Sequence, residues 1–146
     1  MIPDFDKDGY LPPGEHAADW DDIEDRFGGN KRRDWLLGGL RRALKALKRA
    51  GCHTAYVDGS FVTDKTEPND FDGVWDIQDV KGALLDPVLL NFDHDRLQQK
   101  TKYHGEFFPA QVPEAASGKV FLEFFQTRTD TGDEKGIVRI DLDTMT

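Results

Sequence analysis

One long amphipathic helix is the feature of this sequence that most restricts its fold. Between residues 31 and 50, leucines recur at steps of three and four, at Leu36, Leu37, Leu40, Leu44 and Leu47. On a helix with about 3.6 residues per turn this spacing gives one apolar stripe, and basic residues cover the other side. The helix must bury its stripe against another layer, and 146 residues have room for one core.

Short apolar segments supply that second layer. Strands are expected at residues 53–58, 71–77, 106–112 and 136–142, whereas 119–126 is ambiguous between helix and strand. Asp19 is expected to cap a helix that ends at Phe27, and residues 83–103 are expected to form helical pieces broken at Pro87, with Asp93 as a cap. We therefore predict an α+β (mixed α/β) fold, a small mixed β-sheet flanked by helices.

The chain is expected to form a single domain over residues 1–146, with residues 1–19 as an extended acidic arm. Pro12, Pro13 and Gly14 interrupt regular structure in this arm. The net charge of −9 argues against broad adhesion to a phosphate backbone. Residues 31–50 nevertheless carry eight of the 19 basic side chains, which predicts a small basic patch on an acidic body.

Cysteine content and hydropathy predict the cellular compartment of the protein. Cys52 is the only cysteine, which excludes an intrachain disulfide and a zinc site made of cysteines, and favours a reducing compartment. The first residues lack the basic and apolar regions of a signal peptide, and the longest apolar run is far shorter than a membrane span. The sequence thus predicts a cytoplasmic protein with no membrane partner.

Residues 4–15, DFDKDGYLPPGE, match the pattern of a calcium-binding loop. Such a loop needs a helix on each side, yet only three residues precede Asp4, and Pro12 and Pro13 stand where the second helix should begin. We therefore interpret this segment as an acidic surface arm.

Asp70 and Asp72 are the candidate metal ligands. On a strand their side chains project to the same side while Phe71 faces the other, with Cβ atoms about 7 Å apart. Two carboxylates at this spacing repel each other unless a proton or a cation lies between them. Because oxygen ligands favour Mg²⁺ or Mn²⁺, the pair predicts a divalent metal site suited to phosphoryl transfer.

Gly59 and Ser60 follow a β-prone segment and are the candidate phosphate-binding residues. Glycine lets a phosphate approach the backbone closely, and successive N–H groups after a strand form an anion-binding concavity. Ser60 adds a hydroxyl donor, and Lys65 is expected to add positive charge next to a triphosphate.

The order Gly-Ser, nine residues, Asp-x-Asp resembles the signature of the polymerase-beta-type nucleotidyltransferase superfamily. The chain is also similar to a family of short, largely uncharacterised bacterial nucleotidyltransferase-like proteins. The segments that carry this second likeness are GSFVTDKTEPNDFD, LPPG, RFGGNKRR and FFQTRTDTGDEKGIVRI.

The resemblance implies magnesium at Asp70 and Asp72 and triphosphate contact at Gly59 and Ser60. It implies transfer of a nucleoside monophosphate from a nucleoside triphosphate such as ATP to a hydroxyl of RNA or protein. It further implies a third carboxylate, which serves as metal ligand and base. Glu106 is the first choice because its strand is expected to end at the active edge of the sheet, with Asp141 and Glu123 as alternatives.

The chain also departs from that pattern. Many small members carry arginine directly after Gly-Ser, where this sequence has Phe61, and we expect no appended helical domain within these 146 residues to hold a base or acceptor. The alternative is a weakly active or inactive relative that serves a cognate protein partner in a toxin–antitoxin or phage-defence system. A metal-dependent nuclease or phosphatase that uses the same acids is a third possibility.

Overall fold

In the computed structural model, which describes residues 2–146, the first two helices begin at residues that cap them. Asp19 caps α1 (Trp20–Phe27): its side chain accepts the N–H of Asp22, whose side chain accepts the N–H of Asp19. Asn30 caps α2 (Lys31–Arg49) by accepting the N–H of Arg33. Both helices match the prediction, and the leucine stripe of α2 is buried.

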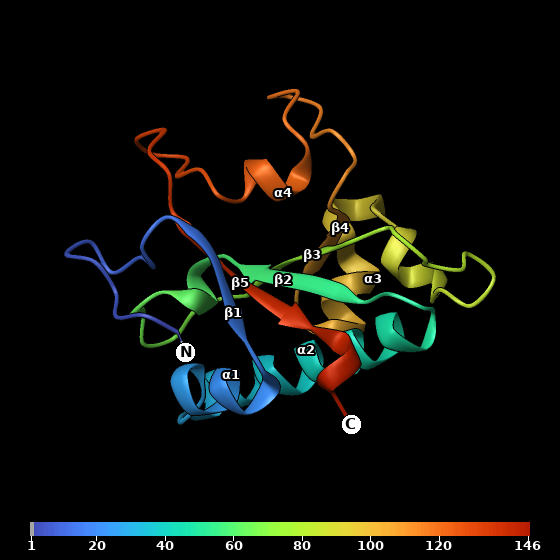
Figure 1. Ribbon diagram of the computed structural model, residues 1–146, viewed down its shortest axis with the longest axis horizontal. Coiled ribbons are helices and arrows are strands. Elements are labelled where there is room, and N and C mark those ends of the chain that lie inside the picture. The colour runs from blue at the N-terminus through green and yellow to red at the C-terminus, as the bar shows by residue number, and fades with distance from the viewer. Residues whose placement is uncertain (1) are drawn as a thin grey trace.

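Five strands form one mixed sheet in the order β1-β5-β2-β3-β4 (Figure 1). β2 is antiparallel to β3 and β5, whereas β1 runs parallel to β5 and β4 parallel to β3. The predicted α+β class is confirmed. The strand bounds are β1 Gly14–Ala18, β2 Thr54–Asp58, β3 Asp72–Trp75, β4 Glu106–Pro109 and β5 Gly136–Asp141.

Alternation along the strands gives the sheet two apolar faces. Ala55 and Val57 of β2 pack into the larger core with α1 and α2, which lie together on one side of the sheet (Figure 1). Tyr56 of β2 faces the other way, into a smaller cluster with Val74, Phe108 and Ile137. Residues 110–135, which include α4 (Phe121–Phe124), cover that second face.

The region between β3 and β4 forms the expected helical pieces. A 3₁₀ turn spans Pro87–Leu90, and α3 spans Asp93–Tyr103. The prediction of Asp93 as the cap is wrong: Phe92 occupies the cap position, and the Asp93 N–H donates to the side chain of Asn91. The ambiguous segment 119–126 is helical only over the four residues of α4. Within residues 2–146, each helix is too short or too polar to traverse a lipid bilayer.

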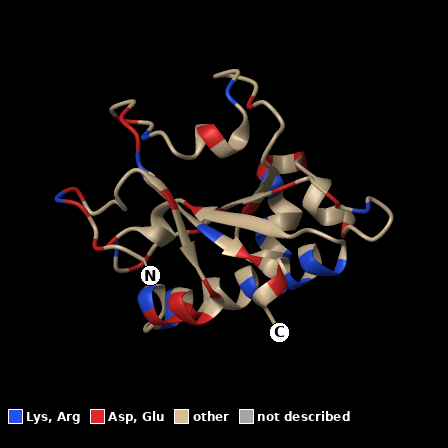
Figure 2. Ribbon diagram, viewed as in Figure 1, with Lys and Arg blue, Asp and Glu red and all other residues tan. Residues whose placement is uncertain are grey.

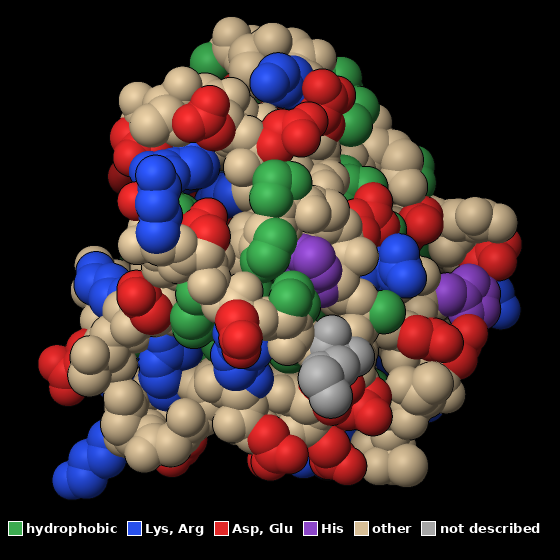
Figure 3. Space-filling view, turned by 60° about the vertical axis from the view of Figure 1, so that its left-hand side comes forward, with side chains coloured by type: hydrophobic (Ala, Val, Ile, Leu, Met, Phe, Trp, Pro, Cys, Tyr) green, Lys and Arg blue, Asp and Glu red, His purple; other side chains and the backbone are tan. Residues whose placement is uncertain are grey.

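The N-terminal segment is part of the fold rather than an extended arm through residue 19; Met1 lies outside the described residues. β1 completes one edge of the sheet, and Ile2 and Leu11 are buried. Three acids of the calcium-like loop each have a different partner. Asp6 accepts backbone N–H groups of its own turn. Asp8 forms an ion pair with Arg128 at 3.1 Å, and Glu15 forms one with Arg139 at 3.4 Å. Figure 3 shows acidic side chains spread over this side of the molecule rather than gathered at one point.

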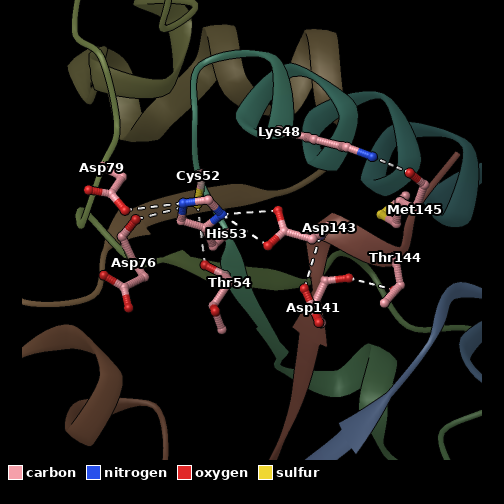
Figure 4. Close-up of polar contacts among 10 residues, drawn as sticks. All are labelled: Lys48, Cys52, His53, Thr54, Asp76, Asp79, Asp141, Asp143, Thr144 and Met145. Atoms are coloured by element: carbon pink, nitrogen blue, oxygen red, sulfur yellow. Dashed lines mark hydrogen bonds and ion pairs between the residues drawn. The ribbon is translucent and has the colours of Figure 1, made fainter.

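His53, just before β2, connects two loops at the edge of the larger core (Figure 4). Its Nδ1 lies 3.0 Å from an Asp143 carboxylate oxygen, and its Nε2 lies 3.2 Å from one of Asp79. The hydrogen bond and charge of Asp143, followed by those of Asp79, raise the pKa of His53. The protonated imidazole therefore holds the C-terminal turn and the 76–80 loop together.

We expect this contact to depend on pH. A folded-state pKa above the unfolded value, about 6.5, means that the contact stabilises fully below that pH and is lost as pH rises through the raised value. His53→Gln should therefore lower the melting temperature more at pH 5.5 than at pH 8.5. The same deficit at both pH values would contradict this role of the imidazolium.

Candidate functional site

A row of three carboxylates crosses the sheet where β2 ends and β3 and β4 begin. In the strand register Asp58 pairs with Asp72, and Asp72 pairs with Glu106. Because paired residues point to the same face, all three side chains lie on the side of the smaller apolar cluster. Asp58 is almost fully buried, with 1% of its surface exposed.

The carboxylates of the row interact strongly with one another. Burial, followed by the charges of Asp58, Asp70 and Glu106, raises the pKa of Asp72 to about 7, and Lys135 opposes this shift. Burial also raises the pKa of Asp58 to about 6, against the opposing effect of Lys135. The row thus concentrates more negative charge than its surroundings balance.

Three cations from distant segments approach the two ends of this row. Lys135, in the loop before β5, places its Nζ 2.9 Å from Asp58. From α3, Arg96 lies 3.2 Å and Lys100 3.0 Å from the same oxygen of Glu106. Asp72, in the middle, has no ion pair of its own within residues 2–146.

Asp70 lies just before β3 and adds a fourth acid. Burial, followed by the charge of Glu106, raises the pKa of Asp70. Phe71 faces the opposite side, as predicted, and its ring packs between Phe61 at 6.2 Å and Phe107 at 5.4 Å. The Asp-Phe-Asp motif therefore places one ring in the larger core and its acids near Glu106.

Gly59 passes close to Asp72 in a conformation that favours glycine. Its φ is +88°, and a Cβ at this position would lie 3.0 Å from a carboxylate oxygen of Asp72. Ser60 begins a short 3₁₀ turn, Ser60–Val62, and its hydroxyl lies 3.5 Å from the carbonyl of Asp70. The Gly-Ser motif thus adjoins Asp70 and Asp72, which follow it by ten or more residues in sequence.

Two arginines at the start of α2 hold the loop that joins these motifs. The buried guanidinium of Arg33 donates to the carbonyls of Phe27 and Phe61 at 3.0 and 2.8 Å, and to those of Thr63 and Lys65. Arg32 donates to the carbonyls of Pro68 and Asn69. Since a guanidinium presents several donors in one plane, each arginine fixes two or more points of the loop.

Phe61 and Lys65 have different surroundings from those expected of phosphate-binding residues. Phe61 is fully buried and packs 5.5 Å from Phe27, which explains why the position after Gly-Ser is aromatic here. The side chain of Lys65 is exposed, and it is its carbonyl that Arg33 holds. Lys135, Arg96 and Lys100 are the cations that the fold brings to the acids.

The row faces a cavity of about 680 Å³ between the sheet and residues 110–135. Asp72, Glu106, Arg96 and Lys135 line its charged part, and five phenylalanine side chains line the remainder together with smaller apolar residues, two threonines and Glu114. This volume falls within the range of small-molecule sites, about 300–1,000 Å³. A ligand with a charged end and an apolar body would match both parts.

Among the three candidates for the third carboxylate, Glu106 is the one that lies beside Asp72. Asp141 pairs with Thr54 at the other end of β2, and Glu123 is exposed on α4. The sequence reasoning missed Asp58, although it directly precedes Gly59 at the end of a predicted strand. It also missed Arg96 and Lys100, which no local motif identifies.

The donor chemistry of the row fits Mg²⁺ or Mn²⁺, which favour carboxylate oxygens and would supply the missing positive charge. Within residues 2–146 no group of three or more His, Cys, Asp or Glu side chains is already arranged around a metal position. The ion pairs of Asp58 and Glu106 hold those two acids instead. Metal binding by Asp70, Asp72 and Glu106 therefore stays a prediction, to which the structure adds Asp58.

Comparison with known proteins identifies one family. The model of DUF6932, a family of unknown function, matches residues 3–141. Neither a curated protein nor a solved structure shows significant similarity to the chain.

We expect Arg33→Lys to destabilise the protein by about 2 kcal/mol or more, because lysine cannot satisfy four separated carbonyls and leaves buried acceptors unpaired. Denaturant unfolding measures the loss, and hydrogen exchange over residues 59–66 reports the loop. Arg41→Lys is the matched control, since Arg41 lies on the same helix and its pair with Glu24 is exposed. Equal effects of the two substitutions would argue against the clamp.

Asp72→Asn should stabilise the metal-free protein at pH 8, on the order of 1–3 kcal/mol, because it removes a buried charge from a repulsive group. A folded pKa above the unfolded value makes wild-type stability increase as pH falls from about 7 toward 4. The advantage of the variant should therefore shrink over that range. Chemical denaturation at pH 8 and pH 5 tests this, and a gain that is unchanged at pH 5 would contradict it.

Proposed function

We propose that this chain, which belongs to DUF6932, a family of unknown function, is a metal-dependent nucleotidyltransferase. The observation that supports this most directly is the meeting of Asp58, Asp70, Asp72 and Glu106 near Gly59, with Asp72 and Glu106 lining a cavity of nucleotide size. The resemblance of Gly-Ser and Asp-x-Asp to the polymerase-beta-type superfamily points to the same chemistry.

The proposed role of each group follows from its position. Gly59 lets the backbone pass directly beside Asp72, and the hydroxyl of the following Ser60 is the proposed donor to the phosphates. Arg96 and Lys135 line the cavity together with Asp72 and Glu106 and would balance phosphate charge. Mg²⁺ or Mn²⁺, when bound by the carboxylates, would neutralise them and polarise the phosphoryl oxygens.

Glu106 is the proposed proton acceptor because it lines the cavity, whereas Asp58 is almost fully buried and does not line it. In the proposed step the acceptor hydroxyl gives its proton to a carboxylate oxygen of Glu106. Its oxygen bonds to the α-phosphorus of the triphosphate, and the bond to the leaving pyrophosphate breaks. The products are a nucleotidylated acceptor and pyrophosphate.

An RNA end is the acceptor that the charge distribution favours. Lys and Arg recur along α2 and α3 on an otherwise acidic protein (Figure 2). Arg42, Lys45, Arg49 and Lys102 line a groove of about 400 Å³ between these helices. Lys102 belongs to α3, the helix whose Arg96 and Lys100 contact Glu106. Backbone phosphates of a short single strand match such a groove.

A binding protein without catalysis is the second candidate, and one observation favours it. The cations of the chain already pair with Asp58 and Glu106, so two members of the row are neutralised without a metal. In this role the fold would serve a cognate protein partner.

The test measures transfer of label from α-³²P nucleoside triphosphates to a short RNA, with MgCl₂ or MnCl₂. We expect labelled RNA from the wild type and about a 100-fold lower rate from Asp72→Asn, as for loss of a group that stabilises transition-state charge. Glu67→Gln is the control, because Glu67 is exposed in the same loop and forms no ion pair within residues 2–146; it should retain the wild-type rate.

Other products separate the alternatives. Labelled protein in place of RNA would reassign the acceptor, and shortened RNA or free nucleoside monophosphate would identify a nuclease or phosphatase. Equal label transfer by the wild type and Asp72→Asn would refute the proposed chemistry. Absence of any metal-dependent nucleotide binding, together with a protein that co-purifies in stable stoichiometry, would select the binding role.

A further inference from the structure

Phenylalanine rings from three separate segments line the cavity beside its charged part. Phe92 precedes α3, Phe108 lies on β4, and Phe121, Phe124 and Phe125 belong to α4 and its end. Phe92 and Phe108 are nearly parallel, at 8° and 5.8 Å between centroids. Phe121 stacks on Phe108 at 22° and 4.5 Å. Phe92, Phe108 and Phe121 thus form a platform of similar orientation, whereas Phe125 is tilted by 37° from Phe108 and Phe124 is nearly perpendicular to Phe125.

This platform is partly open. Phe92 is 40% exposed and Phe121 is half-buried, although both line the cavity. The exposed part of an aromatic side chain adds no burial energy to the fold, whereas a flat ligand could cover the open ring faces. Thr127 and Thr129 line the same cavity and offer hydroxyl groups at its edge.

The two ends of the cavity together specify the shape of a ligand. One end carries Asp72, Glu106, Arg96 and Lys135, which suit a phosphate chain and its cation. The other end offers parallel aromatic rings, which suit a planar heteroaromatic ring more closely than a flexible acyl chain. A nucleotide has both parts in one molecule.

We infer that Phe92 and Phe121 bind the base of the nucleoside triphosphate by stacking, with the sugar between this platform and the carboxylate row. This inference rests on the proposed function, and it assigns the base-binding residues that the sequence motifs do not contain. Because Phe92 and Phe121 come from different segments, the bound base would also hold the start of α3 and α4 together.

Calorimetry distinguishes the contribution of the base to the binding affinity from that of the phosphates. Tripolyphosphate and ATP are each titrated into the protein with MnCl₂, and the two dissociation constants are compared. Stacking predicts that the wild type binds ATP at least about fivefold more tightly than tripolyphosphate. Phe92→Leu and Phe121→Leu should reduce this ratio toward one while tripolyphosphate affinity stays within about twofold.

Phe5→Leu is the matched control, because Phe5 packs against Phe27 outside the cavity; it should leave the ratio unchanged. Phe92 is exposed enough for its substitution to preserve folding, which the melting temperature verifies.

The outcomes distinguish the inference from the proposed function. Equal affinity of the wild type for ATP and tripolyphosphate, both lost in Asp72→Asn, would overturn the base site and keep the phosphate site. An unchanged ratio in both phenylalanine variants would also overturn it. If neither compound binds, the proposed function and the inference both fail.

Discussion

The buried guanidinium of Arg33 is the interaction on which the arrangement of the site depends. It donates to carbonyls at the end of α1 and at three points of the loop after Ser60. A loop with so many backbone groups near the core needs internal partners, because an unpaired buried carbonyl costs about 1–3 kcal/mol. One side chain satisfies four carbonyls, and it thereby positions Gly59 against Asp72.

The acids of the site work against the stability of the fold. Asp58 and Asp72 have pKa values raised to about 6 and 7, so their ionised forms are disfavoured in the folded chain. The fold offsets part of this repulsion with Lys135 at one end of the row and with Arg96 and Lys100 at the other. Destabilising repulsion between buried acids is expected at sites where residues serve binding or chemistry rather than stability.

Local patterns predicted most of the elements because short-range physics determines them. The α2 stripe, the Asp19 cap and the segments of β2, β3, β4 and β5 all follow from periodicity and capping. The prediction failed where pairing between distant segments decides the conformation. β1 forms because β5 offers an unpaired edge to residues 14–18.

The sequence by itself determined three local features: a Gly-Ser turn after a strand, two acids flanking Phe71, and one long helix with an apolar stripe. Those features depend on neighbours within a few residues, so no fold is needed to see them. Only the tertiary structure decided that Asp58 and Glu106 flank Asp72, that Lys135 and two cations of α3 pair with them, and that five phenylalanines line the same cavity as Asp72 and Glu106. Strand register and packing between remote segments set these distances, and neither is encoded in local spacing.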